Sequence, residues 1–255
     1  IGHFDSALLD WIVIVFMILG SLPFVLYFAM VRGNPRALVR DTQVQWFIAT
    51  VIVSILLVAF WLVTKNDIDV LRALRLSSFN VVSIITGTGY ASADYNAWGV
   101  LPVTSFFFFM FIGGCAGSTS CGIKIFRYQI LFANIRVQFR RLWQPNVVYS
   151  PRYNRKPIPE SVTHAVMSFF FLFALVFGIL ALVLTLIGLD FMTAVSGAAT
   201  AIANVGTALG PTIGPSGTFA PLPDAAKWTL SIGMLLGRLE LFTVLVLFSP
   251  AFWRA

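Results

Sequence analysis

Long stretches of this sequence carry no Asp, Glu, Lys or Arg, and they constrain the fold more than any other feature. Residues 11–31 and 46–64 contain none of these side chains, and residues 162–189 contain no titratable group except His164. A helix needs about 20 apolar residues to cross a bilayer. Only 11% of the residues are charged, whereas soluble domains carry about 25%. The sequence therefore predicts an all-α polytopic membrane protein.

The cysteines and the N-terminus narrow the class further. Cys115 and Cys121 are too few for a disulfide framework or a zinc site. The chain begins at Ile1 with no basic leader before the first apolar block, so we expect no signal peptide and expect a fragment of a longer protein. No membrane-embedded His, Asp or Glu cluster and no nucleophile–base pair is evident in the sequence. We therefore expect no enzymatic activity.

The apolar segments repeat in a pattern of long span, short half-span, Gly-containing turn and long span. Long spans are expected at residues 9–31, 46–63, from 98 to beyond 113, 162–189 and 225–248, and half-spans at 70–85 and 191–203. The pattern occurs at 46–133 and again at 162–252, as in many channels and transporters. We expect four parts: 1–45, a closing transmembrane helix of a preceding repeat plus a cytoplasmic loop; 46–134, a repeat with a broken second helix; 135–160, a basic cytoplasmic linker; and 161–255, a further repeat.

Basic residues gather on one side of the predicted spans. Residues 124–156 hold eight of them, and Arg32, Arg36 and Arg40 lie two crossings away, on the same side. By the positive-inside rule this side is cytoplasmic, so both half-spans enter from outside. Topology thus accounts for the net charge of +7, and we do not expect nucleic acid as a partner.

The first half-span stops at Ile85-Thr-Gly-Thr-Gly-Tyr90. A half-helix that ends inside a membrane leaves carbonyls unpaired, which is tolerated where the backbone lines a water- or ion-filled cavity. Glycines allow successive carbonyls to point inward and replace the hydration shell of a cation. An ordinary extracellular turn is the alternative. The second half-span stops at Asn204-Val-Gly-Thr207, in the same place in the pattern. The predicted selectivity-filter residues are Thr86, Gly87, Thr88, Gly89, Tyr90, Asn204, Val205, Gly206 and Thr207.

Ten consecutive small residues, 113–122, interrupt the third long segment. Gly113 and Gly117 form a Gly-xxx-Gly pair, so close helix packing is one explanation. The other is a flexible intramembrane loop that gates a path below the filter. Arg238 lies midway in the predicted span 225–248, where a charge is costly and a functional role is the default hypothesis. A buried ion pair with a distant carboxylate is the alternative for Arg238.

Three groups of residues resemble the Trk/Ktr/HKT superfamily of potassium transporters, in particular its bacterial Trk-type membrane subunit. They are Ile84-Ile-Thr-Gly-Thr-Gly-Tyr90, Phe111-Ile-Gly-Gly-Cys-Ala-Gly-Ser-Thr119, and Gly237-Arg-Leu-Glu-Leu-Phe-Thr243 with Ser249-Pro-Ala-Phe-Trp253. The resemblance implies four helix–pore loop–helix repeats around one path, as in potassium-channel subunits, of which this chain holds the third, the fourth and the end of the second. It also implies a gate formed by Gly113, Gly114, Gly117, Ser118, Gly122 and Arg238.

The resemblance further implies a function and partners. We expect potassium uptake across the bacterial cytoplasmic membrane, with potassium as substrate at filter carbonyls and no covalently bound cofactor. Membrane lipid, a homodimer and a cytosolic nucleotide-binding ring of RCK domains are the expected partners. A carrier for sodium or another monovalent cation is the alternative, and an auxiliary structural subunit is a further one. In the superfamily, serine in place of a filter glycine favours sodium, whereas Gly89 and Gly206 are both present here.

Overall fold

The computed structural model describes residues 2–4, 6–144, 151–154, 156–239, 243, 246–247 and 252–253. Most of the C-terminal motif at 240–253, including Glu240, lies outside these residues. The helices are α1 (Ala7–Gly20), α2 (Phe24–Val31), α3 (Arg36–Arg40), α4 (Thr42–Lys65), α5 (Val70–Ile85), α6 (Val100–Phe109), α7 (Ile125–Trp143), α8 (Glu160–Leu186), α9 (Phe191–Ala203) and α10 (Asp224–Arg238), with 3₁₀ helices η1 (Gly2–Phe4) and η2 (Tyr95–Trp98). Strands β1 (Arg152–Tyr153) and β2 (Lys156–Pro157) pair antiparallel, with Arg152 opposite Pro157.

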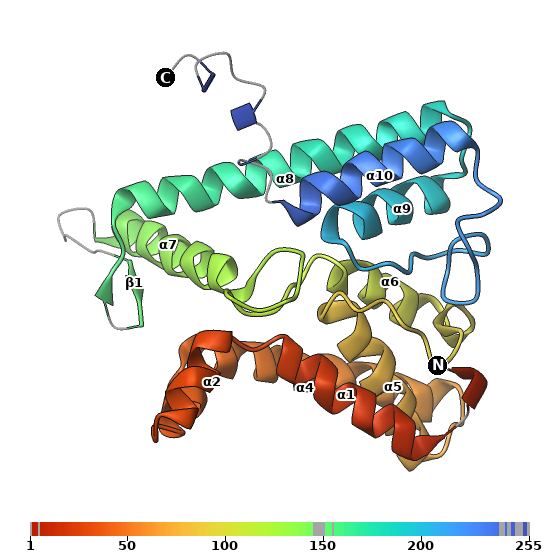
Figure 1. The fold of residues 1–255 in the computed structure, drawn as a ribbon, viewed down its shortest axis with the longest axis horizontal. Helices are drawn as coiled ribbons and strands as arrows, with labels where there is room; N and C mark the ends of the chain where they lie inside the picture. Colours follow the sequence, from red (N-terminus) through yellow and green to blue (C-terminus); the bar gives the residue numbers. More distant parts are fainter. Residues whose placement is uncertain are drawn as a thin grey trace.

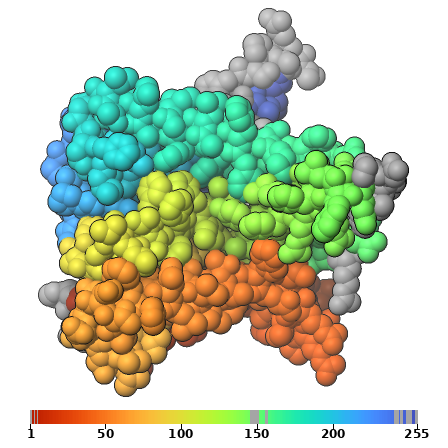
Figure 2. Space-filling model, turned by 180° about the vertical axis from the view of Figure 1, so that it is seen from behind, coloured from red at the N-terminus to blue at the C-terminus, as the bar shows by residue number. Residues whose placement is uncertain are grey.

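The helices form two groups with a broken helix between them (Figure 1). In the first group α5 packs against α1 and α4, and in the second α9 packs against α8 and α10. Helices α6 and α7 lie between the groups, where α6 contacts α5 and α7 contacts α8. Seen from behind, the three parts appear as stacked bands (Figure 2). Each group therefore contains one half-helix packed against two other helices.

Among the described residues, α4 and α8 are each long and apolar enough to cross a membrane. Their exposed faces carry large apolar side chains such as Phe60 and Phe171, each 71% exposed, which are suited to contact with lipid. This confirms the prediction of a helical membrane protein.

The span predicted at 9–31 is not one continuous helix, because α1 and α2 meet at a bend of 93°. Pro23 cannot donate a backbone hydrogen bond, and the chain leaves the helix at Ser21. The carbonyls freed by the break accept hydrogen bonds from a distant loop: the Thr119 amide donates to Gly20 O at 3.1 Å, and the Cys115 amide donates to Ser21 O at 3.0 Å. The break is therefore stabilised by tertiary contacts.

The two half-helices have the bounds predicted from the sequence. At 1.5 Å per residue, α5 and α9 are about 24 and 20 Å long, too short for a hydrocarbon core of about 30 Å. Each begins at an aspartate cap: Asp69 accepts from the Leu71 amide at 3.1 Å, and Asp190 accepts from the Thr193 amide at 3.0 Å. Hydrogen bonding from Thr193 lowers the pKa of the Asp190 carboxyl, so this negative charge persists at the positive end of the helix dipole.

One other predicted boundary also needs correction. The linker expected at 135–160 begins inside a helix, because the basic amphipathic segment continues α7 to Trp143. Of the last span, expected at 225–248, the structure describes helix α10 from Asp224 to Arg238. Most of residues 240–248 lie outside the described residues, so the position of Arg238 midway along this span stays a prediction. The break expected in the third long segment is present between α6 and α7.

The hydrophobic core joins the two groups at the ends of the half-helices. Side chains from the second group, Ala199, Ala203, Val205 and Leu209, belong to the core cluster built mainly by α1, α4, α5 and α6. The shared core places the ends of α5 and α9 beside each other.

Candidate functional site

The two glycine turns predicted as filter strands touch each other. A Cβ built on Gly89 would overlap the Val205 carbonyl oxygen and lie 3.2 Å from the Gly206 Cα. A Cβ on Gly87 would lie 3.4 Å from the Asn204 carbonyl oxygen. Residues more than 110 positions apart in the sequence thus share one site.

Both turns use left-handed backbone at equivalent positions. Gly87 and Gly89 have φ of 71° and 75°, and Asn204 and Gly206 have φ of 53° and 106°. Side chains with a Cβ avoid this region, and Gly and Asn tolerate it best. The equivalence of Gly87 with Asn204, and of Gly89 with Gly206, aligns the two motifs residue by residue.

The amides of both turns point back to their half-helices. The Thr88 amide donates to Ser83 O at 2.9 Å, and the Gly89 amide donates to the same oxygen at 3.3 Å. In the second turn the Val205 amide donates to Thr200 O at 3.0 Å, and the Gly206 amide to Thr200 Oγ1 at 3.0 Å.

These amide bonds fix the direction of the carbonyls. The described peptide bonds are trans, and a trans peptide directs its N–H and C=O to opposite sides. The carbonyls of Gly87, Thr88, Asn204 and Val205 therefore point away from the half-helices that hold them.

Side chains of the half-helices hold the segments that follow the turns. Asn80 donates to Ser92 Oγ at 3.0 Å and accepts the Ser92 amide at 3.2 Å. Ser196 donates to Leu209 O at 3.1 Å and accepts the Leu209 amide at 3.2 Å. Sequence reasoning missed both residues, although a buried polar side chain in an apolar half-span was a usable signal.

A second set of bonds crosses between the repeats. The Tyr95 hydroxyl, buried in the core, donates to Thr207 Oγ1 at 3.1 Å. The Asn96 side chain donates to Gly210 O at 3.1 Å and accepts the Gly210 amide at 3.3 Å. Tyr90, the last residue of the first motif, is instead 55% exposed, beside a groove lined by Thr86, Thr88 and α1. Hydrogen bonds from Tyr95 and Asn96 to Thr207 and Gly210 therefore join the two turn regions in addition to the direct contact between the turns.

The Gly-rich segment 113–122 is a folded loop and not a helix. The Gly113 amide donates to Ile123 O at 2.9 Å, and the Ile123 amide to Phe111 O at 3.1 Å, which closes the base of the loop. Gly117 and Gly122 have φ of 73° and 71°. The explanation as a helix-packing Gly-xxx-Gly pair is therefore wrong for Gly113 and Gly117.

This loop, which includes Gly114 and Ser118, packs against the break between α1 and α2. Besides the bonds to Gly20 and Ser21, Gly117 O accepts the Phe24 amide at 3.0 Å, and Ser120 Oγ lies 2.7 Å from Ser21 Oγ. A Cβ on Gly114 would lie 2.6 Å from Ser120 Oγ, so the loop is tightly closed. Its far end reaches the first glycine turn, because the Cys121 amide nitrogen lies 3.7 Å from a Cβ built on Gly87.

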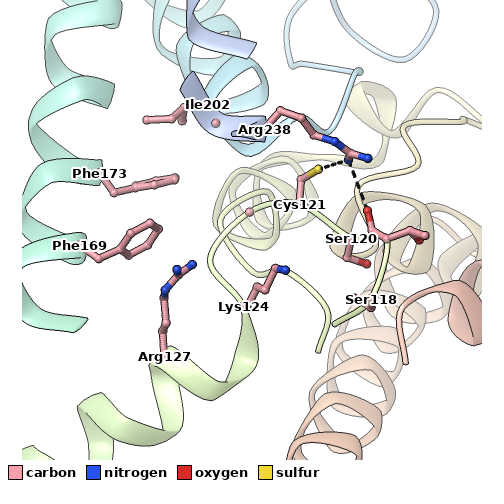
Figure 3. Close-up of a pocket in the computed structure, with 12 residues that line it drawn as sticks. Ser118, Ser120, Cys121, Lys124, Arg127, Phe169, Phe173, Ile202 and Arg238 are labelled. Carbon is pink, nitrogen blue, oxygen red and sulfur yellow. Dashed lines mark hydrogen bonds between the residues drawn. The ribbon is translucent and has the colours of Figure 1, made fainter. Parts of the chain in front are cut away.

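Arg238 joins the end of α10 to this loop (Figure 3). Its guanidinium donates to Cys121 Sγ at 2.6 Å and to Thr119 O at 3.4 Å. Within the described part of the chain, no carboxylate forms a salt bridge with Arg238. The structure thus brings Arg238 together with the Gly-rich loop and, through Cys121, with Gly87. Sequence reasoning had not singled out Thr119 and Cys121 as partners of Arg238, because both are more than 110 residues away.

The fold has two half-helices, α5 and α9, whose glycine turns meet, and two helices, α4 and α8, that are long enough to span a membrane. These features define a polytopic membrane protein with re-entrant loops. The family model described as TrkH, a cation transport protein, matches residues 1–255. The chain belongs to this family of cation transport proteins, which confirms the resemblance seen in the motifs.

Relatives cover the whole chain. It is 52% identical over 253 residues to the Trk system potassium uptake protein TrkI of Halomonas elongata, covering 99% of this chain and 51% of that protein. It is 33% identical over 257 residues to the Trk system potassium uptake protein TrkH of Escherichia coli, covering 100% and 52%. The crystal structure of the potassium transporter TrkH from Vibrio parahaemolyticus superposes with a TM-score of 0.91 at 33% identity, covering 99% of this chain and 54% of that one. The chain spans about half the length of these relatives.

Proposed function

We propose that the full-length protein takes up potassium through a path lined by backbone carbonyls of residues 86–90 and 204–207. The observation that carries this proposal is the contact between two left-handed glycine turns at the ends of two half-helices. Carbonyls directed away from the half-helices replace the water shell of potassium. The C-terminal ends of α5 and α9 add partial negative charge, which favours a cation at the same place.

Two more repeats complete this path. The chain spans 51% of the length of its Halomonas elongata relative, which supports the proposal that a full-length protein contributes two further filter strands. The proposed assembly is a homodimer in the bacterial cytoplasmic membrane, surrounded by lipid and bound to a cytosolic RCK ring. No covalently bound cofactor is part of the proposal, since potassium is the substrate.

Selective uptake tests the proposal. In liposomes that carry the full-length protein, we expect rubidium, which stands in for potassium, to enter much faster than sodium. Gly89→Ser should lower this preference, because a side chain at a left-handed position displaces the filter carbonyls. Gly188→Ser is the matched control, since Gly188 has φ of 103° in open space after α8. Equal rubidium and sodium entry through the wild type would contradict the proposal and favour the sodium carrier.

We also propose that the Gly-rich loop and Arg238 gate this path. The loop residues are Gly113, Gly114, Gly117, Ser118 and Gly122. Cys121 of the same loop lies beside Gly87 and holds the Arg238 guanidinium, so the loop and the charge stand next to the filter. A guanidinium remains charged at any accessible pH. At an effective dielectric near 20, a cation about 6 Å away is repelled by roughly 3 kcal/mol, which slows permeation by about a hundredfold.

Arg238→Ala should therefore increase potassium flux per folded protein by up to about a hundredfold. Arg36→Ala is the matched control, since it removes an exposed arginine from α3 without touching the loop. Cys121→Ala should have a smaller effect, because it removes the thiol contact and keeps the charge. If normalised flux through Arg238→Ala fell or stayed level while thermal stability dropped, Arg238 would be a structural residue and not a gate.

A further inference from the structure

The first turn of α4 contacts the Gly-rich loop through a glutamine side chain. The Ala116 amide donates to Gln43 Oε1 at 2.9 Å, across 73 positions of the sequence. The bonds described above hold the loop to the break between α1 and α2, at residues 20–24. Gln43 thus ties the half-buried Ala116 to a different helix.

The backbone at Gln43 is held on two sides. Asp41 caps α4, because its Oδ1 accepts the Gln43 amide at 2.9 Å and the Val44 amide at 3.3 Å. From α7, the buried Gln129 donates its side-chain amide to Thr42 O at 2.9 Å. The Gln43 side chain therefore reaches the loop from a fixed starting point.

The hairpin of β1 and β2 packs against the same turn of α4. Thr42 Oγ1 donates to Asn154 Oδ1. Strand β1 lies beside α7 (Figure 1). Ile158, directly after β2, shares a small core with Ile130 of α7 and Val166 of α8. The hairpin belongs to the basic segment 135–160, which the positive-inside rule assigns to the cytoplasmic side.

Tyr153 of β1 connects this hairpin to Gln43. Burial raises the pKa of the Tyr153 hydroxyl to about 12, and a hydrogen bond with Gln43 opposes the rise. A hydrogen bond lowers the pKa of an acid when the partner donates to its charged form. Because Gln43 Oε1 accepts the Ala116 amide, Nε2 is the group left to donate to Tyr153. The two ends of one side-chain amide thus join the hairpin to the loop.

We propose that Gln43 is a positioning residue for the Gly-rich loop and that Tyr153 controls it from the cytoplasmic hairpin. In the arrangement described here, Gln43 holds the Ala116 amide and keeps the loop closed. Movement of the hairpin away from α4 separates Tyr153 from Gln43 and lets the side-chain amide turn, which releases Ala116. The effect on flux rests on the proposed function, in which this loop gates the path, whereas the effect on loop mobility does not.

Hydrogen–deuterium exchange of residues 113–122 in the full-length protein measures how firmly the loop is held. Gln43→Ala removes both contacts, so exchange at Ala116 should rise about fivefold, as expected for the loss of one hydrogen bond. Tyr153→Phe leaves the Ala116 contact in place, and a rise of about twofold is expected. The double variant should match Gln43→Ala, because both substitutions break one chain of contacts. Rubidium flux into liposomes should rise in the same order.

Gln45→Ala is the matched control, since the exposed Gln45 donates to Val39 O at 3.0 Å and does not touch the loop. Gln43→Glu keeps an acceptor for both contacts and should behave like the wild type. If Gln43→Ala does not fold, Gln43→Met removes the amide at similar length and carries the same expectation.

The proposal is overturned if exchange of the loop stays at the wild-type level in the Gln43 variant. It is also overturned if the effects of the Gln43 and Tyr153 substitutions multiply in the double variant, because the two residues would then act separately. Raised exchange with unchanged rubidium flux would contradict the gating role of the loop and support the positioning role of Gln43. Raised exchange in a protein that fails to take up rubidium would contradict the proposed function and again leave the positioning role standing.

Discussion

The two glycine turns reach the same backbone shape with different residues. The first uses Gly87 and Gly89, and the second uses Asn204 and Gly206. Asn204 accepts the left-handed conformation and also donates its side-chain amide to Met234 O in α10 at 2.9 Å. A Cβ at Gly87 would instead face the Asn204 carbonyl oxygen and the Cys121 amide. The second turn is therefore held by a side-chain hydrogen bond, whereas the first turn is held by close backbone contact.

The space around the two equivalent glycines, Gly89 and Gly206, also differs, and Gly89 is the more crowded one. A Cβ on Gly89 would overlap the Val205 carbonyl oxygen, whereas a Cβ on Gly206 would have its nearest neighbour at 3.6 Å. The helices that follow differ as well. After the first turn, the chain forms α6, the Gly-rich loop and α7. After the second turn it forms α10, and Arg238 at the end of α10 contacts Cys121 in that loop. The turn after α5 and the Gly-rich loop that follows α6 are thus more closely packed than the turn after α9.

The largest expected effect is on stability, and it differs between alanine substitutions at Gly89 and at Gly206. Gly89→Ala adds left-handed strain and a steric overlap, so we expect a loss of about 3 kcal/mol or more in stability. Gly206→Ala adds strain alone, and a loss of about 1–2 kcal/mol is expected. Thermal unfolding of the full-length protein in detergent measures both.

Gly188→Ala provides the scale for strain without a neighbour, because Gly188 combines φ of 103° with open space. Gly206→Ala should resemble this control, and Gly89→Ala should exceed it. Equal losses at Gly89 and Gly206 would show that the crowding at Gly89 is relieved by a small shift, and the comparison between the repeats would fail.

A smaller effect is expected at Asn204. Asn204→Gly keeps the left-handed backbone and loses the bond to Met234, so it should cost about 1 kcal/mol. Asn204→Ala loses the same bond and adds strain of about 1–2 kcal/mol. Melting temperatures should therefore fall in the order wild type, Asn204→Gly, Asn204→Ala. If the alanine and glycine variants melted together, the conformation of Asn204 would not depend on its left-handed preference.

The half-helices and their turns could be predicted from the sequence because local signals mark both ends. An apolar run too short for a bilayer begins after Asp69 or Asp190 and stops at a glycine motif. The break between α1 and α2 could not be predicted in this way. Residues 11–31 carry no charged side chain, and the partners that stabilise the break at Gly20 and Ser21 come from residues 115–120. Long-range contacts of this kind leave no local pattern.

The candidate site shows the same division between local signals and long-range contacts. The motif residues themselves were predicted, since Gly and Asn at left-handed positions have a local cause. The side chains behind them, Asn80, Tyr95 and Ser196, depend on partners that only the fold brings near. The end of α7 was missed because its basic residues, which suggested a linker, lie on an amphipathic helix.

The position of a bound rubidium ion in the full-length protein tests the central claim most directly. Crystals grown in rubidium would be measured at its absorption edge, so that anomalous density marks the ion. The account predicts density between residues 86–90 and 204–207, next to the carbonyl oxygens of Thr88 and Val205. Rubidium bound elsewhere along a continuous path, with none at these carbonyls, would contradict the assignment of the two glycine turns as one filter.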